Sequence, residues 1–319
     1  FDSGGSSAAI RRAFGMPSVG DLRNRLMALA DQSVRGNPEI YNLFGYRFPV
    51  DRNENDLRGR LEAMIAGDDA LVAAIPNPLR KVISNHLDYF RQAMPAGFDL
   101  RGASVGNLIL AGGYVNQGCQ LDPVVYIFTK LIEARGVVRP LTGRSLHLGA
   151  VLHSGQTVLG QHKLTGKETA GPTAAIERLF LNEGWEEVKP TSLPLRGEIR
   201  ALIAQADVIC YPIGSFYTSL IANLLVTGIG DAIAANFCPK VFTPNPVPDP
   251  ETYGLSTAGQ VETLLAYLKE SCVESHPPSR LLDIVLVDTE RGSYPAVSYT
   301  HLRAHETPEH LVCRLLLEK

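Results

Sequence analysis

A glycine- and serine-rich turn opens the chain, where Asp2 precedes Gly4, Gly5, Ser6 and Ser7 and a helix-forming run follows. Glycines let a backbone approach a ligand closely, and the amides at a helix start attract anions, so this turn is a candidate phosphate site. The two serines can add hydroxyl donors, and Asp2 can hold a divalent cation, Mg²⁺, against phosphate oxygens. The alternative is that one serine only caps the helix.

A second turn of the same build is expected after an apolar strand at 207–211. Gly214 and Ser215 there lead into a helix whose first turn carries Tyr217, Thr218 and Ser219. Three hydroxyls in one first turn exceed what capping requires, so this turn also predicts an anion site.

A third loop offers an amide, a carboxylate and a hydroxyl. Asn245 ends a strand expected at 240–243, and Glu251 and Thr252 follow a proline-rich stretch. These groups suit the hydroxyls of a ribose or another sugar, although Asn is also an ordinary turn residue. Because ligands bind at the carboxyl ends of strands in open α/β sheets, we expect all three loops to surround one ligand.

Two further helix starts carry polar side chains. Asp21, Arg23 and Asn24 lie within one helical turn, and Asn107 follows Val105 and Gly106 at another helix start. Arg23 suits pairing with a phosphate, and we expect it to act together with Asp2 in catalysis. The simpler interpretations are that Asp21 interacts with the positive end of its helix and that Asn107 caps.

The elements that must position these residues form an α/β protein. Apolar spacing predicts mostly helices over about 36–95, which we interpret as a helical insertion. A hairpin is expected at 147–160, and strands are expected at 137–140, 207–211, 240–243 and 283–287. Strands that alternate with helices in the second half favour a Rossmann-like, doubly wound, mostly parallel sheet within one domain, 1–296.

Composition limits the classes of partner. The chain has 319 residues and a formal net charge of -3, so it has no strong positive field for a nucleic acid or an anionic membrane. None of the five cysteines forms a C-x-x-C pair. We expect a cytoplasmic protein with a small-molecule ligand, and the sequence leaves homo-oligomer formation open.

The last segment, 297–319, is expected not to belong to the native protein. Its residues VSYTHLRAHET resemble a reading frame through a transposase sequencing adapter, and LVCRLLLEK resembles the primer that follows it. We therefore reject a metal site at His301 and His305, and together with the abrupt start we expect a fragment clipped at both ends.

Several landmarks in this order resemble the 2-phospho-L-lactate transferase (CofD) superfamily, and are most similar to its gluconeogenesis-factor-like (YvcK-like) branch. They are Asp2-Ser-Gly-Gly-Ser-Ser, Gly20-Asp-Leu-Arg-Asn, Val105-Gly-Asn-Leu-Ile-Leu-Ala, Ala206-Asp-Val-Ile, Gly214-Ser-Phe-Tyr-Thr-Ser, Asn223-Leu-Leu-Val-Thr-Gly-Ile, and Glu251-Thr with Gly254. The resemblance implies a Rossmann-like fold whose first strand and primary phosphate loop lie upstream of Phe1.

Two functions follow from the resemblance. In the transferase branch, Mg²⁺ assists transfer of a phospholactyl-type group from a nucleoside diphosphate carrier to a deazaflavin alcohol. In the gluconeogenesis-factor branch, the site is associated with nucleotide sugars and with regulation of carbon or cell-wall metabolism. The pattern departs at Ser3, where the YvcK-like branch has a second acidic residue, which favours the non-catalytic regulator somewhat.

Overall fold

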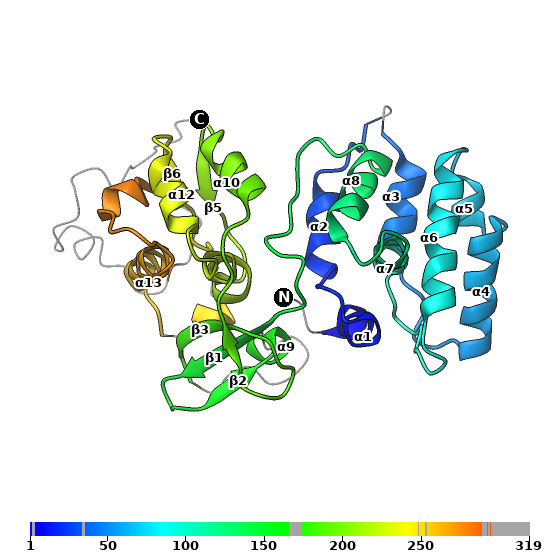
Figure 1. The fold of residues 1–319 in the computed structure, drawn as a ribbon, viewed down its shortest axis with the longest axis horizontal. Coiled ribbons are helices and arrows are strands. Elements are labelled where there is room, and N and C mark those ends of the chain that lie inside the picture. The colour runs from blue at the N-terminus through cyan, green and yellow to red at the C-terminus, as the bar shows by residue number, and fades with distance from the viewer. Residues whose placement is uncertain are drawn as a thin grey trace. The chain divides into compact units, whose positions relative to one another are not determined.

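The computed structural model describes residues 1, 4–33, 36–165, 174–247, 249–252, 254–288, 292 and 294 (Figure 1). It contains two compact units, and the boundary between them in the chain falls between Ser145 and Leu146. The assignment of 1–296 to one domain stays a prediction.

The first unit is helical throughout its described residues, apart from turns and an isolated bridge between Arg47 and Ser104. Its helices are α1 (Gly5–Phe14), α2 (Gly20–Ala28), α3 (Pro38–Gly45), α4 (Glu54–Ala66), α5 (Ala70–Ala73), α6 (Leu79–Ala93), α7 (Val105–Asn116) and α8 (Leu121–Leu131). The predicted helical block at about 36–95 contains α3 to α6, and its status as an insertion stays a prediction.

Helix α7 is the centre of the first unit. It contacts α1, α2, α3, α6 and α8, and each of its residues from 105 to 114 is buried. Gly112 allows the close contact between α7 and α6. A Cβ on Gly112 would lie 1.7 Å from the carbonyl oxygen of His86 in α6, so only glycine permits this helix crossing.

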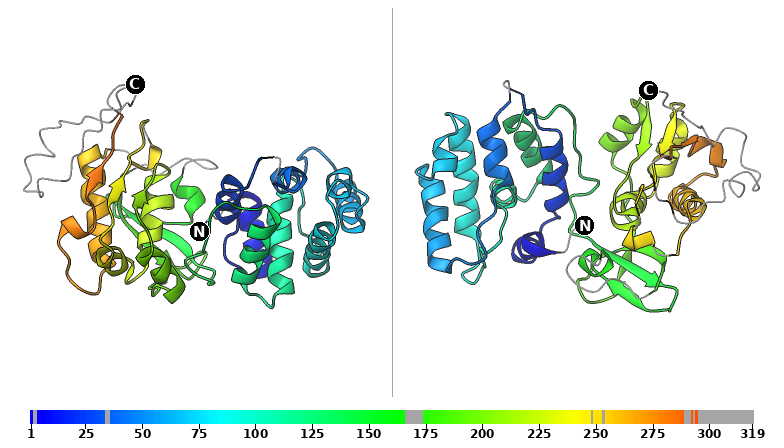
Figure 2. Two further views of the ribbon diagram at one scale, coloured as in Figure 1. Left: turned by 90° about the horizontal axis from the view of Figure 1, so that it is seen from above. Right: turned by 180° about the vertical axis from the view of Figure 1, so that it is seen from behind.

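The second unit combines two sheets with helices (Figure 2). An antiparallel sheet has the order β2-β1-β3-β4, made of β1 (His147–Leu152), β2 (Thr157–Leu159), β3 (Ile176–Asn182) and β4 (Pro190–Thr191). A parallel sheet has the order β5-β6-β7, made of β5 (Ile209–Tyr211), β6 (Lys240–Phe242) and β7 (Ile284–Val285). The helical segments are α9 (Gln161–Leu164), α10 (Gly197–Ala204), the π-helix η1 (Phe216–Ile221), α11 (Ala222–Leu224), α12 (Ile229–Ala235), η2 (Pro250–Thr252), α13 (Thr257–Glu270) and η3 (Pro278–Arg280).

The mixed α/β class, the hairpin and the parallel strands are confirmed. The expectation of a mostly parallel sheet is wrong for the described residues, because their larger sheet is antiparallel. Strands β3 and β4 were not foreseen, since β3 pairs with β1 across a long sequence separation that no local pattern reports. Residues 137–140 are irregular, because their backbone joins neither of these sheets. The doubly wound, Rossmann-like arrangement stays a prediction.

Candidate functional site

The first unit buries an arginine among helix starts. Arg23, in the first turn of α2, is only 7% exposed. Its guanidinium donates to the Ser104 hydroxyl, to Asn24 Oδ1 at 2.7 Å and to the Phe44 carbonyl oxygen at 3.5 Å. Gly106 makes room for the side chain, since a Cβ there would lie 2.8 Å from Arg23 Cδ. We call Ser6, Arg23, Asn24 and Ser104 the Arg23 cluster.

Among the described residues, no carboxylate neutralises the positive charge of Arg23. Within the described part of the chain, no Asp or Glu forms an ion pair with it, and its buried Nε has no hydrogen-bond partner. Burial and then repulsion from the Arg47 guanidinium lower the pKa of Arg23 to about 10. A buried cation of this kind favours an anion beside it.

The starts of α1 and α7 add hydrogen-bond donors near this charge. Ser6, at the start of α1, accepts from the backbone amide of Ser104 at 3.5 Å, which links the two helix starts. No described residue accepts a hydrogen bond from four of the amides at these helix starts. They are the amides of Gly106 and Asn107 in α7 and of Gly5 and Ser6 in α1. Such amides at a helix N-terminus carry partial positive charge, so their environment suits an anion.

The structure therefore brings together three of the residues predicted in the first unit, Ser6, Arg23 and Asn24. The hydroxyl of Ser7 is instead paired with that of Ser18 at 3.2 Å. Asp21 is exposed.

Gly4, Gly5 and Asn107 also lie at the starts of α1 and α7. Gly4 is the N-cap of α1 and Gly5 its first residue. Asn107 is buried, and its Oδ1 has no hydrogen-bond partner in the described structure. Asp2, the expected metal ligand, lies outside the described residues.

Sequence reasoning missed Ser104 and Arg47. Ser104 directly precedes the Val105-Gly-Asn motif, and a serine at a helix N-cap is a recognisable signal. Arg47 had no local signal, because only tertiary packing places it close enough to Arg23 to affect its pKa.

In the second unit, the loop after β5 is held by an asparagine. Asn245 accepts from the Gly214 amide at 2.8 Å through Oδ1 and donates to the Gly214 carbonyl oxygen at 2.6 Å through Nδ2. The predicted proximity of these two residues is thus seen, and both polar atoms of the Asn245 side chain are used within the protein.

Carboxylates of the protein itself occupy the start of η1. Glu251 Oε2 accepts from the amides of Tyr217 and Thr218 at 2.9 and 2.8 Å, and its Oε1 accepts from the Thr218 hydroxyl at 2.6 Å. Asp249 Oδ2 accepts from the Phe216 amide at 2.8 Å. A buried carboxylate thus accepts from donors that a phosphate would need, and the anion site expected at this loop stays a prediction.

Two hydroxyls of this loop keep free hydrogen-bonding capacity. Ser215 and Ser219 are half-buried, and their side chains have no hydrogen-bond partner in the part of the chain that the structure describes. By contrast, the Tyr217 hydroxyl donates to the Ile176 carbonyl oxygen, and the Thr252 hydroxyl donates to that of Asp249 at 3.0 Å. Ser215 and Ser219 are therefore the side chains of this loop still able to bind a ligand.

The described residues give limited support for Mg²⁺. Mg²⁺ prefers carboxylate and water oxygens, but Asp249 and Glu251 belong to no group of three potential metal ligands among the described residues. Asp21 has an exposed carboxylate at the start of α2.

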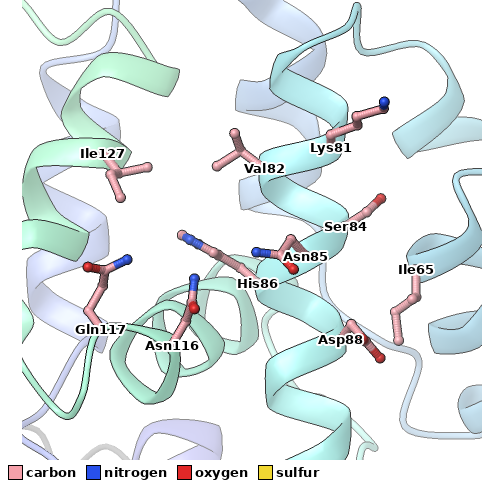
Figure 3. A pocket seen from close by; sticks show the side chains of 10 residues that line it. All are labelled: Ile65, Lys81, Val82, Ser84, Asn85, His86, Asp88, Asn116, Gln117 and Ile127. Carbon is pink, nitrogen blue, oxygen red and sulfur yellow. The ribbon is translucent and has the colours of Figure 1, made fainter.

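A shallow groove of about 670 Å³ lies elsewhere on the first unit, beside α6 (Figure 3). Its lining residues are Ile65, Lys81, Val82, Ser84, Asn85, His86, Asp88, Asn116, Gln117 and Ile127. None of the residues predicted from the sequence lines it. His86 is buried there, and this burial lowers the pKa of its imidazole.

Comparison with known proteins gives consistent matches. The family model described as 2-phospho-L-lactate transferase CofD matches residues 1–311. A putative gluconeogenesis factor of Nostoc sp. is 31% identical over 92% of this chain and 49% of its own length. The gluconeogenesis factor of Bacillus subtilis is 28% identical over 91% of this chain and 69% of its own length. The chain thus spans about half of the Nostoc relative.

Solved structures agree with these matches. A crystal structure of a Bacillus halodurans protein of the UPF0052 family aligns with a TM-score of 0.63 and 25% identity, covering 95% of this chain and 73% of that one. The resemblance noted in the sequence is confirmed. The family match runs past Val297, and the assignment of 297–319 to adapter sequence stays a prediction that lies outside the described residues.

Proposed function

Because the chain belongs to the 2-phospho-L-lactate transferase CofD family, we propose that it binds a small molecule linked to a nucleoside diphosphate. The ligand is a nucleotide sugar or a nucleoside diphosphate-linked phospholactate. Its phosphates bind at the Arg23 cluster, and the protein is cytoplasmic, with a doubly wound, Rossmann-like arrangement of its sheet. The Gly4–Ser7 turn and Asn107, at the starts of α1 and α7, complete the ligand site of the first unit.

The observation that carries the proposal is the buried guanidinium of Arg23, with which no carboxylate of the described residues forms an ion pair. Burying a cation without a counter-charge lowers the stability of the folded state, so such a group is rare in proteins unless it binds an anion. A phosphate offsets this loss of stability, because its oxygens can accept hydrogen bonds from the Arg23 Nε–H and from the Gly106 and Asn107 amides, for which the described residues offer no acceptor.

If the protein is a transferase, the chemistry occurs at a phosphate. Such reactions depend on positioning and charge stabilisation more than on a nucleophilic side chain. Arg23 would hold the phosphate and stabilise its charge. Asp2 would hold Mg²⁺, which neutralises phosphate charge when it is bound.

The second candidate function is a non-catalytic sensor of nucleotide sugars that regulates carbon or cell-wall metabolism. Two observations favour it. The relatives at 31% and 28% identity bear the name gluconeogenesis factor. In addition, neither Asp249 nor Glu251 belongs to a group of three potential metal ligands among the described residues.

Calorimetry of the chain tests the proposal. UDP-glucose, UDP-N-acetylglucosamine, GDP-mannose and GDP are titrated with and without Mg²⁺, and adenosine, which has no phosphate, is the control. We expect at least one diphosphate to bind and adenosine not to bind. Saturable binding that persists without Mg²⁺ and without product supports the sensor, whereas Mg²⁺-dependent product formation supports the transferase. Equal heats for adenosine and all diphosphates would reject a phosphate site.

A further inference from the structure

The second unit contains a cluster of three potential metal ligands that the proposed function does not use. Asp231 lies in the first turn of α12, and Cys272 and His276 follow the end of α13. One ligand atom from each residue lies within 4.8 Å of the other two. From this geometry we propose that Asp231, Cys272 and His276 bind a divalent transition metal of the zinc class.

The donor set suits such an ion. Zinc is bound by thiolate, imidazole and carboxylate groups at about 2.0–2.3 Å, which places neighbouring ligand atoms of a tetrahedron about 3.3–3.8 Å apart. Asp231 Oδ1 and His276 Nε2 are 3.0 Å apart, so small side-chain shifts suffice. A thiol beside an imidazole selects zinc or cobalt over magnesium or calcium, which prefer oxygen ligands alone.

The backbone holds the carboxylate in place. Asp231 Oδ2 accepts from the Val273 amide at 2.8 Å, and Oδ1 accepts from the Glu274 amide at 3.1 Å. These bonds leave other lone pairs of the carboxylate for a metal. They also orient Asp231 toward the segment that carries the other two ligands, as hydrogen bonds to metal-binding carboxylates commonly do.

The thiol also has a defined position. Cys272 Sγ donates to the Leu268 carbonyl oxygen at 3.1 Å. A Cβ on Gly230, the residue before Asp231, would lie 2.4 Å from this sulfur, so the glycine provides its space. Metal binding replaces the proton of the Cys272 thiol and the proton on His276 Nε2, and both leave to solvent. It also replaces the hydrogen bond between Asp231 and His276. A water completes the coordination, and the ion ties α12 to the end of α13.

The test is a Co²⁺ titration of the chain without nucleotide, followed by competition with Zn²⁺. We expect one equivalent of Co²⁺ to produce a thiolate-to-cobalt charge-transfer band that Zn²⁺ abolishes. Cys272→Ser should remove the band, and His276→Gln should weaken binding more than tenfold. Circular dichroism establishes that each variant is folded, and His276→Gln serves if the serine variant is not.

Two matched controls make the result specific. Cys210→Ser removes an exposed thiol of the same unit and should leave the band unchanged. The double variant His301→Gln/His305→Gln removes two of the three histidines of the final segment and should also leave the band unchanged. Absence of a band in the unaltered chain, its persistence in Cys272→Ser, or its loss in the double histidine variant would each overturn the proposal.

Discussion

Replacing Arg23 by methionine separates a ligand-binding role of this residue from a purely structural one. Methionine has a similar length and no charge, and it cannot donate to a phosphate. If Arg23 is kept for an anion, the variant should fold nearly as well as the unaltered chain and bind the ligand much more weakly. If Arg23 only supports the fold, the variant should be strongly destabilised and should bind the ligand with unchanged affinity.

The magnitudes follow from the contacts of Arg23. Lowering its pKa from 12.5 to about 10 corresponds to about 3 kcal/mol against the charged form in the folded state. Because the folded-state pKa lies below the unfolded one, this cost is fully present at neutral pH and is relieved only as the pH rises above about 10. The variant removes the cost but leaves the Ser104 hydroxyl and the Phe44 carbonyl without their donor, a loss of about 1–3 kcal/mol. The free energy of unfolding should thus change by less than about 2 kcal/mol.

Binding should change much more than stability. A charge-assisted hydrogen bond contributes about 1.5–3 kcal/mol, so losing it weakens binding roughly 10- to 150-fold. Urea unfolding measures the first quantity, and calorimetry with the tightest diphosphate of the panel measures the second. The matched control is Arg25→Met, which removes an exposed arginine from the same helix and should change neither quantity. Destabilisation above about 4 kcal/mol with unchanged affinity would refute the ligand role.

Three further predictions concern the fold. Gly112→Ala should destabilise the protein by more than about 3 kcal/mol, because its methyl group would overlap the His86 carbonyl oxygen. The control Gly59→Ala, in α4 with open space around it, should stabilise the protein by about 0.5–1 kcal/mol. Urea unfolding compares the two variants, and equal effects would contradict the close crossing of α6 and α7. Glu251→Ala should lower the free energy of unfolding by about 2–5 kcal/mol, because it leaves two buried amides without an acceptor. Glu251→Gln should lower it less, because its amide oxygen can accept from both amides. If the alanine variant loses less stability than the glutamine variant in urea unfolding, Glu251 does not hold η1. Burial lowers the pKa of His86 below its usual 6.5, so folding stability should fall as the pH decreases below about 6.5, and His86→Gln should reduce that fall in unfolding experiments at pH 7 and pH 5.

Much of the candidate site could be read from local sequence. Glycine and hydroxyl residues in the sequence indicate the helix starts that carry Ser6, Arg23 and Asn24. The structure places these three residues together. The family could be inferred in the same way, because it depends on short motifs in a fixed order.

Other features depended on residues distant in the chain. The sequence signals at Tyr217 and Thr218 correctly indicated a helix start that attracts a negative charge, but no local pattern could say which charge binds there. Glu251, 33 and 34 residues away, supplies that charge in the structure.

By itself, then, the sequence determined the family, the mixed α/β class and the helix starts, since each of these depends on residues close together in the chain. Tertiary structure alone decided which charges are neutralised: Glu251 is buried against amides, whereas Arg23 is buried near Arg47 without a carboxylate partner among the described residues. The physical reason is that burial and charge–charge distance are properties of packing, and side chains far apart in sequence set both.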